Sequence, residues 1–290
     1  SYVIEAGNAS RTLLMDLATL QWSEEMCALF GVPAARLPRI VASNADFGAT
    51  AGLDALPDGV PIVGVLGDSH AALFGHGCRT TSEGKATYGT GSSVMVPSGA
   101  DRSVRPGVST TLAWLTDKPM YGHEGNIVAS GTAMDWTARL LGVTPGRALD
   151  ELAATVPDSA GISLVPAFTG LGAPWWDRRA VGLVAGLTAA TERGHLARAA
   201  LESVAHQIAD VVEALGAGDL TVLHADGGAT ASRLLMQTQA DLLGRDVVVS
   251  ANAEVSALGA ALMGFTRLGW DLPAPEGGAG RRYRPALDEP

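Results

Sequence analysis

The sequence predicts an α/β fold, a mixed sheet flanked by helices, on three observations. Aliphatic and small residues dominate, aromatic side chains are few, and 36 of 290 residues are glycine, a composition typical of close-packed α/β enzymes. The apolar segment 62–66 reads as a buried strand with a helix-like segment behind it. A second strand, a glycine turn and a helix follow one another over residues 220–243.

The first 60 residues predict short elements. Residues 2–4 resemble a strand fragment, and residues 8–12 a polar turn. Ser23 is a suitable N-cap for a helix over residues 24–30, because glutamates occupy its first turn. Gly31, Pro33 and Pro38 then favour a loop. We expect this segment to be structural and to wall one side of a cleft.

Asp68 follows Gly67 at the end of the predicted strand 62–66. A carboxylate at that position lies at the mouth of a sheet, half desolvated, where its basicity can be tuned. An aspartate after a strand is also a common helix N-cap, and that alternative stays open.

The segment Tyr88-Gly89-Thr90-Gly91-Ser92-Ser93 joins two predicted strands, 85–88 and 92–97, with a third at 110–115. A turn with so little side-chain bulk lets backbone N–H groups and a hydroxyl approach a phosphate closely. It is equally compatible with an ordinary hairpin turn. A base beside a phosphate cradle suggests phosphoryl transfer to a hydroxyl group.

The second half alternates between helices and strands. The pattern predicts helices at 131–141, 195–215 and 234–243 and one beginning near 256, and strands at 163–168, before Gly186, at 220–224 and at 247–249. Within helix 195–215, apolar residues spaced by three and four predict one buried stripe: Ala197, Leu201, Val204, Ile208, Val211 and Leu215. We expect His206 and Gln207 to pack beside it and His195 to face solvent. For Trp175 and Trp176, packing in the core or between domains is favoured over stacking on a substrate.

The turn Gly227-Gly228 follows the strand 220–224 and precedes a helix. Such a turn admits a ligand to free N–H groups at a helix N-terminus. Most turns of this kind simply connect a strand to a helix, so the pattern alone is a weak signal.

Composition excludes several partners. The net charge is −10 and the isoelectric point is near 5.0, which argues against nucleic acid and anionic membranes as partners. The two cysteines lack metal-site spacing and fit a reduced intracellular protein, although a disulfide between them stays open. Because we find neither a signal peptide nor an apolar run of the ~20 residues that a membrane helix needs, we expect a soluble, cytoplasmic protein.

Four segments together resemble the FGGY carbohydrate kinases, and most closely their glycerol kinase members: G-D-S-H-A-A-L-F-G-H-G-C (67–78), K-A-T-Y-G-T-G-S (85–92), A-F-T-G-L-G-A-P-W-W-D (167–177) and D-G-G-A with E-V-S-A-L-G-A-A (226–261). The resemblance runs from Val3 to Tyr283. It implies an actin-like ATPase (ribonuclease H-like) domain over residues 78–290. Residues 1–77 would be the tail of a second such domain, the sugar-binding one.

The resemblance implies ATP-dependent phosphorylation of a hydroxyl on a small polyol or sugar, with ATP and Mg²⁺. Asp68 would be the catalytic base and would hold the metal through water. The other residues with implied roles are Ser69 and Ser93 for the substrate, Gly89, Thr90 and Gly91 for the β- and γ-phosphates, and Gly131, Asp135, Gly227, Gly228 and Ser232 for the rest of the nucleotide.

Four positions depart from the glycerol kinase pattern. Ser69 and Ser93 stand where glycerol kinase has Gln and Phe, which enlarges the pocket and hints at a longer polyol or a ketose. Asp135 and Ser232 replace Gln and Asn and keep their hydrogen-bonding ability. His70 could orient the substrate, or it could serve packing or the start of a helix.

The resemblance covers only the latter part of a family member, without the D-x-G-T-type loop that opens such enzymes. We therefore expect the chain to be a fragment with little or no kinase turnover alone. The alternative is a non-catalytic actin-like nucleotide-binding module that acts through a partner. Hydrolysis by Asp68, Ser69 and His70 fits poorly, because no G-x-S-x-G elbow accompanies them. The sequence decides neither the substrate nor the oligomeric state, and a homo-oligomer stays open.

Overall fold

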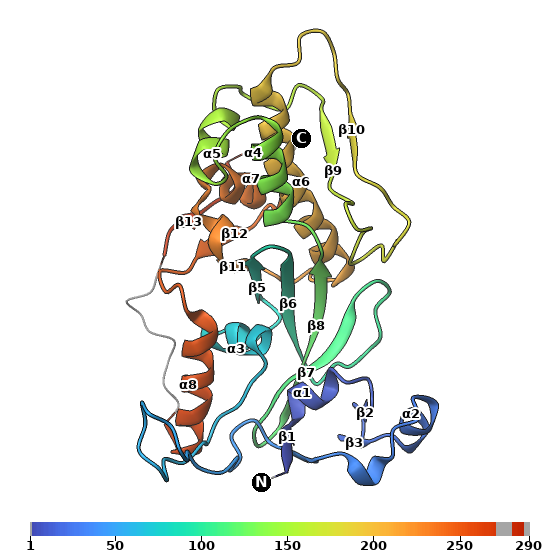
Figure 1. Ribbon diagram of the computed structural model, residues 1–290, viewed down its shortest axis with the longest axis vertical. Coiled ribbons are helices and arrows are strands. Elements are labelled where there is room, and N and C mark those ends of the chain that lie inside the picture. The colour runs from blue at the N-terminus through green and yellow to red at the C-terminus, as the bar shows by residue number, and fades with distance from the viewer. Residues whose placement is uncertain (1, 271–279, 287–290) are drawn as a thin grey trace.

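A seven-stranded mixed sheet forms the centre of the molecule, in the order β13-β12-β11-β5-β6-β8-β7 (Figure 1). The computed structural model describes residues 2–270 and 280–286. β5, β11 and β12 run parallel, and the remaining pairs are antiparallel. The strands are β5 (Glu83–Tyr88), β6 (Ser92–Gly99), β7 (Ser109–Leu115), β8 (Pro119–Ile127), β11 (Val222–Asp226), β12 (Asp246–Val249) and β13 (Arg282–Tyr283). The predicted mixed sheet is confirmed.

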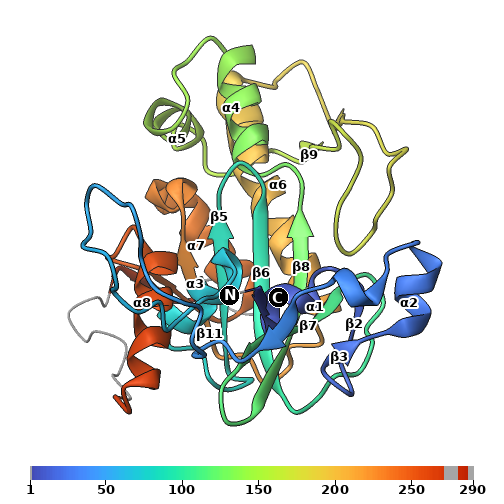
Figure 2. The same cartoon turned by 60° about the horizontal axis from the view of Figure 1, so that its bottom comes forward.

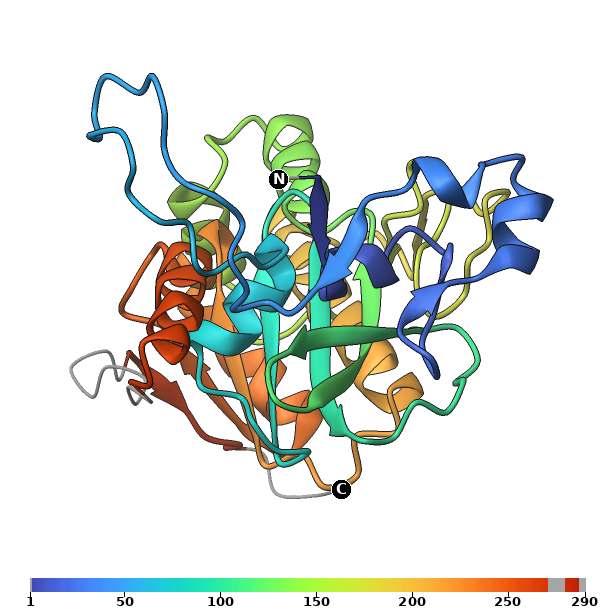
Figure 3. The same cartoon turned by 90° about the horizontal axis from the view of Figure 1, so that it is seen from below.

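Helices cover both faces of this sheet because its strands alternate apolar side chains between the faces. Val94 and Val96 of β6 join a core cluster with α6 (Arg193–Ala214) and α7 (Arg233–Leu243). Met95, between them, joins a cluster with α3 (Asp68–Gly75) and α8 (Val255–Arg267) on the other face. α3 and α8 lie side by side in both Figure 1 and Figure 3.

The long helix α6 confirms the predicted apolar stripe, since all six stripe residues are buried. α4 (Gly131–Leu140) and α5 (Arg147–Ala153) pack beside it at one end of the sheet (Figure 2). Gln207 donates to the carbonyls of Ala129 and Ser203, which confirms its packing role. The same prediction for His206 is wrong, because this side chain is exposed. His195 is half-buried, and its Nδ1 accepts the Glu192 N–H at the start of α6.

Residues 2–45 form a small layer against β7 and β8. It contains β1 (Val3–Glu5), α1 (Ala6–Ser10), β2 (Met15–Asp16), β3 (Gln21–Trp22), α2 (Glu24–Leu29), the 3₁₀ helix η1 (Ala34–Arg36) and β4 (Arg39–Val41), with β1 and β4 paired in parallel. Ser23 caps α2 by accepting the Met26 N–H, as predicted. Ala6 and Met15 pack on Leu112 and Tyr121 of the sheet, which fastens the layer. The segment between β4 and α3 projects from the body (Figure 3).

The remaining elements are the antiparallel pair β9 (Ser163–Val165) and β10 (Leu183–Ala185) and the 3₁₀ helix η2 (Gly228–Ala231). None of the helices in the described ranges is long and apolar enough to cross a membrane.

Three further sequence predictions differ from the structure. Residues 62–66 form no strand: they are extended, the Val65 N–H donates to the Ser43 carbonyl, and Ile62 is 40% exposed. Residues 6–10 are helical because the Glu5 carboxylate caps their N–H groups. Trp175 and Trp176 are 62% and 55% exposed, so they are not core residues.

Candidate active site

A polar pocket of about 370 Å³ lies where α3 begins above strands β5, β6 and β8. Its wall contains three of the predicted site residues, Asp68, Ser69 and Ser93, and also Lys85 and Glu124. Asn8, Arg11, Gly67, His70, Thr87, Asn126 and Ser256 complete the lining. Thr87 and Ser93 are paired opposite each other, two residues before Gly89 and two residues after Gly91. The pocket therefore adjoins the predicted phosphate-binding turn.

Asp68 is the first residue of α3, and Gly67 is its N-cap. The residue is exposed rather than half desolvated, because no buried strand precedes it. Its Oδ1 accepts the Ser69 N–H at 2.7 Å, and Ser256 Oγ donates to its carbonyl at 3.0 Å. A carboxylate in a first helical turn is stabilised by the free N–H groups there. Asp68 is therefore held at the mouth of the pocket, open to a ligand.

The pocket floor is a network of buried charges bridged by the two serines. Lys85 Nζ donates to Ser69 Oγ at 2.7 Å and to Ser93 Oγ at 3.0 Å. Glu124 Oε1 accepts from the same two hydroxyls at 3.0 and 2.9 Å. Arg11 pairs with Glu124 Oε2 at 3.0 Å. Since Lys85 and Glu124 are 0% and 3% exposed, the network satisfies two charges that would otherwise be buried alone.

The protonation of this floor follows from burial and from neighbouring charges. Burial lowers the pKa of Lys85, against the opposing influence of Glu124 and other carboxylates. Burial alone would raise the pKa of Glu124, but Arg11 and Lys85 together bring it below its ordinary value. Burial lowers the pKa of His70 to about 4. At neutral pH the carboxylate is therefore ionised and His70 is neutral.

Three predicted glycine positions converge through direct backbone contacts. The Gly131 N–H donates to the Gly89 carbonyl at 3.0 Å, and a Cβ on Gly131 would come within 2.6 Å of that oxygen. Gly227, at φ +95°, lies against the Tyr88 backbone so closely that a Cβ would clash. The two glycine turns and the start of α4 thus form one surface, packed so closely that neither Gly131 nor Gly227 has room for a side chain. The N–H of Gly89 is used inside its own turn, by the Gly91 carbonyl.

Thr90, Asp135, Gly227 and Gly228 are exposed around this surface and are therefore accessible to a ligand. Ser232 differs from the prediction of a nucleotide contact. It is 7% exposed, caps α7 by accepting the Leu235 N–H, and hydrogen-bonds with Asp150 of α5. Its hydroxyl therefore anchors the start of α7 behind the turn.

Two buried side-chain contacts join the parts of the site. His76 at the end of α3 bonds to Asp226, directly before Gly227, at 2.7 Å. The Tyr88 hydroxyl, at the end of β5, donates to Gln239 of α7 at 3.0 Å. The helix that carries Asp68 is thereby tied to the second glycine turn.

Sequence reasoning missed Lys85, Glu124, Arg11, His76 and Asp226 as site residues. One signal could have found Lys85: it is one of only two lysines in the chain and lies in a β-prone segment that is otherwise apolar or small. Glu124 stood in a segment to which no strand was assigned, so the face it occupies could not be predicted.

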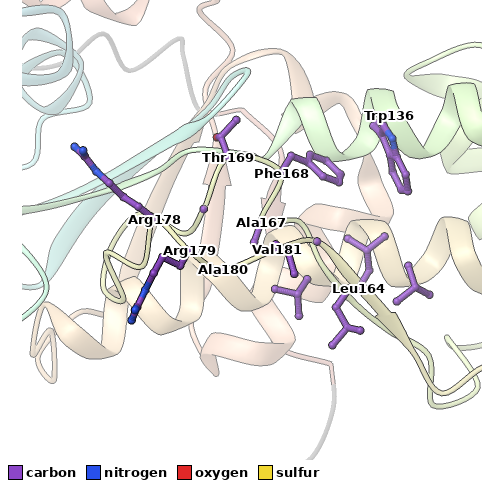
Figure 4. A pocket seen from close by; sticks show the side chains of 14 residues that line it. Trp136, Leu164, Ala167, Phe168, Thr169, Arg178, Arg179, Ala180 and Val181 are labelled. Atoms are coloured by element: carbon purple, nitrogen blue, oxygen red, sulfur yellow. The ribbon is translucent and has the colours of Figure 1, made fainter.

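A larger cavity, about 650 Å³, lies apart from Asp68 between Trp136 and the segments around β9 and β10. Trp136 and Phe168 meet there with ring centroids 5.0 Å apart, whereas Arg178 and Arg179 extend away from the cavity in different directions (Figure 4). The described residues that line it place no converging polar groups there, so we assign it no chemistry. The described part of the chain also contains no cluster of three His, Cys, Asp or Glu residues that could hold a metal.

The sequence matches the C-terminal domain of the FGGY family of carbohydrate kinases over residues 84–268 and the family's N-terminal domain over residues 1–75. It is 45% identical over 275 residues to an apulose kinase of Pectobacterium atrosepticum, covering 93% of this chain and 55% of the relative. It is 46% identical over 283 residues to a glycerol kinase of Myxococcus xanthus, covering 94% and 57%.

Solved structures agree with these matches. Plasmodium falciparum glycerol kinase with ADP superposes with a TM-score of 0.89 at 31% identity, covering 99% of this chain and 60% of that one. A xylulose kinase from Rhodospirillum rubrum gives 0.83 at 30% identity, covering 98% and 60%. The chain thus spans little more than half the length of the proteins that it matches. The predicted actin-like fold is confirmed.

Proposed function

Because the chain belongs to the FGGY family of carbohydrate kinases, we propose that the protein transfers the γ-phosphoryl group of ATP to a hydroxyl group of a small polyol or sugar. One observation carries the proposal. The exposed Asp68 carboxylate shares a polar pocket with Thr87 and Ser93, which flank the Gly89–Gly91 turn. A base, a polyol-sized polar pocket and a backbone surface open to phosphate thus adjoin one another.

Asp68 acts as the general base. Its carboxylate accepts the proton of the substrate hydroxyl while that oxygen forms a bond to the γ-phosphorus and the bond to the β-phosphate oxygen breaks. The products are a phosphate monoester and ADP. Placement at the start of α3 keeps the carboxylate exposed and its position fixed by Ser69 N–H. Most of the acceleration then comes from alignment of the two reactants.

The glycine surface is the part of the chain that fits a nucleotide. Gly89, Thr90 and Gly91 would hold the β- and γ-phosphates, and Gly131, Gly227 and Gly228 would leave room for the α-phosphate and the nucleoside. The proposal is supported by Gly131 and Gly227, whose lack of a side chain lets these backbone segments pack closely together, and by Gly228, where a Cβ would meet nothing within 4 Å. Asp135 would approach the nucleotide from α4, while Ser232 supports the turn from behind.

A magnesium ion would be held by Asp68 through water together with phosphate oxygens, because the described residues offer no cluster of three metal-ligating groups of their own. Bound there, the ion would neutralise charge on the phosphates.

Ser69 and Ser93 would contact the substrate from the pocket floor. Their small side chains leave a cavity of about 370 Å³, within the usual range of roughly 300–1,000 Å³ for small-molecule sites. The proteins most similar to this chain include an apulose kinase and glycerol kinases. We therefore propose a ketose or a polyol longer than glycerol as the substrate.

The domain boundary at residues 77 and 78 stays a proposal, supported by family matches that end at 75 and begin again at 84. We also propose that the protein acts in the cytoplasm, which supplies ATP and keeps thiols reduced; Cys27 and Cys78 are both free and buried. The net charge of −10 supports a small neutral substrate over nucleic acid or anionic membrane.

A coupled ADP-release assay on the full-length protein tests the function, with glycerol, erythritol, pentitols and ketopentoses as substrates. Asp68→Asn is expected to lower kcat by about 10²–10⁴-fold, the usual contribution of a general base. Asp117→Asn, at an exposed position outside the pocket, is the matched control and should behave as the parent. Equal rates for the parent and Asp68→Asn would remove the base assignment. ATP binding in a calorimeter without ADP release on any substrate would favour a non-catalytic nucleotide-binding module.

A further inference from the structure

Ser69 and Ser93 lie between a buried cation and a buried anion, and this arrangement dictates where their protons point. Each hydroxyl oxygen is within 3.0 Å of Lys85 Nζ and within 3.0 Å of Glu124 Oε1. The two oxygens are 2.9 Å apart. Lys85 can only donate when its amine is protonated, and an ionised Glu124 can only accept.

Counting the protons in the network leaves two arrangements of the serine hydroxyls. The three protons of the Lys85 ammonium group have three acceptors in range: Ser69, Ser93 and Thr87, the last at 3.3 Å. Both serine protons must therefore point elsewhere, and the acceptor they share is Glu124. If one serine donates to the other instead, the second still donates to Glu124. In either arrangement both protons are consumed inside the network, so neither serine donates to a ligand. When both serines donate to Glu124, each keeps one lone pair for a ligand. When one serine donates to the other, only the donating serine keeps one, because the accepting serine also binds the Lys85 N–H.

On the basis of the kinase function proposed above, we propose that Lys85 and Glu124 are positioning residues that make Ser69 and Ser93 act only as hydrogen-bond acceptors toward the substrate. The substrate must then present a free hydroxyl group to each serine that keeps a lone pair. A carbonyl, ether or phosphate oxygen at those positions would meet oxygen lone pairs and be rejected. The floor thus selects an unmodified polyhydroxy segment beside the phosphorylated carbon.

If a serine hydroxyl turned toward the substrate, the buried Glu124 carboxylate would lose a hydrogen bond. A serine that turned to donate to the substrate would take a donor from Glu124, which is only 3% exposed and would lose one of its hydrogen bonds. Arg11 has N–H groups beyond the one that binds Glu124. A substrate carbonyl, as in a ketose, therefore belongs beside Arg11 and away from the serines.

Substrate analogues give the direct test. The best substrate of the panel above is compared with two analogues whose hydroxyl beside the phosphorylated carbon is replaced by hydrogen or by fluorine. Fluorine can accept a hydrogen bond but cannot donate one. We expect both analogues to lose about tenfold or more in kcat/KM, since a site built to bind a hydroxyl donor rejects both. A fluoro analogue that keeps the parent's rate while the deoxy analogue loses it would overturn the inference.

The Glu124→Gln variant allows a measurement that would not change if Glu124 had only a structural role. The amide can donate to the serines, which frees their protons for the substrate. In this variant, kcat/KM for the fluoro analogue should therefore rise relative to kcat/KM for the hydroxyl substrate, whatever the absolute rates. An unchanged ratio of the two rates would count against Glu124 as the orienting group.

The two lysines of the chain allow a test that needs no turnover and still reports if Glu124→Gln does not fold. In protein labelled with ¹⁵N at lysine Nζ, Lys85 should give a slowly exchanging ammonium signal, because it is buried, whereas Lys118 is exposed. Ser69→Ala and Ser93→Ala should each shift that signal. Ser98→Ala, farther along β6, should not.

Failure of this inference and failure of the proposed kinase function would give different results. A Lys85 signal that is a neutral amine at neutral pH, or that ignores both serine substitutions, overturns the orienting network alone. Absence of any phosphorylated substrate with an intact Lys85 signal overturns the kinase function alone.

Discussion

For His70, the structure supports a role in packing over a role in orienting the substrate. It lines the pocket but is 3% exposed, and its Nδ1 has no hydrogen-bond partner in the described part of the chain. That nitrogen faces Gly7, where a Cβ would come within 2.9 Å of it. A buried atom turned toward a helix backbone supports packing, one of the two roles open from sequence.

This burial makes His70 a source of acid sensitivity. Its pKa is lowered to about 4, first by burial, with charges on Glu124, Arg11, Lys85 and Asp68 acting in both directions. In the unfolded chain His70 binds a proton near pH 6.5, so between about 4 and 6.5 the unfolded state holds more protons and stability rises with pH. The stability that depends on a neutral His70 is fully present above about pH 6.5 and is lost as the pH falls from 6.5 to about 4.

We expect the parent to lose roughly 2 kcal/mol of unfolding free energy from this group between about pH 7 and pH 5. Urea unfolding of His70→Gln at both pH values should show a correspondingly smaller loss. His206→Gln, at an exposed histidine, should keep the parent's difference. A His70→Gln profile as steep as the parent's would place the acid sensitivity elsewhere.

At the residue scale, local patterns located Asp68 and the glycines but not the network around them. Asp68, Gly89 and Gly227 each stand in a distinctive short motif, so sequence alone could single them out. Lys85 and Glu124 are 39 residues apart and meet only because β5 and β8 both flank β6. Register across strands is set by tertiary pairing, and no local signal carries it.

At the element scale, the crossing of α3 and α8 positions Asp68. Gly259 of α8 lies so close to the Ala71 carbonyl of α3 that any Cβ would clash, and a Cβ on Gly75 would meet the Val255 carbonyl at 2.5 Å. The close approach lets Ser256 reach the Asp68 carbonyl. The helix that carries the proposed base is therefore seated by glycines on both helices.

Gly259→Ala should consequently destabilise the protein by about 1–3 kcal/mol, as overpacking does. It should also lower activity by shifting α3. Gly264→Ala on the same helix is the matched control: its Cβ would meet only Val63, at an ordinary 3.8 Å. Because alanine favours a helix over glycine by about 0.5–1 kcal/mol, that variant should be neutral or stabilised. Thermal unfolding should show a lower melting temperature for Gly259→Ala but not for Gly264→Ala, and equal destabilisation of the two would contradict the close-contact explanation.

Sequence patterns predicted the elements with strong periodicity and missed those without it. α6 and β6 each carry a long apolar pattern and appear where expected. β8 was missed because polar and glycine residues fill its pocket-facing and helix-facing positions, as in His123-Glu124-Gly125-Asn126. The strand expected at 62–66 is absent because its apolar residues connect the projecting loop to α3 instead of joining the sheet.

At the scale of the whole molecule, contacts cross the proposed domain boundary at residues 77 and 78. Leu73 and Phe74 of α3 share a core cluster with Trp114 of β7 and with Met263 of α8. Arg11 reaches Glu124 from the first layer. The His76–Asp226 contact crosses the same boundary. A boundary by sequence family is thus not expected to be a boundary between independent folding units.

Met263→Ala tests whether the two sides of the boundary at residues 77 and 78 unfold as one unit, because Met263 is fully buried in the cluster that joins them. Truncating a buried methionine should cost about 2–5 kcal/mol. In a urea titration, far-ultraviolet circular dichroism and labelling of the Cys78 thiol, which is buried in the same cluster, should move together to lower urea. Leu268→Ala, at a residue 57% exposed, should change stability by less than about 0.5 kcal/mol. Labelling of Cys78 at urea concentrations well below the circular dichroism transition would show that α3 separates from the sheet on its own. The proposed base and the proposed nucleotide surface would then belong to units that unfold independently.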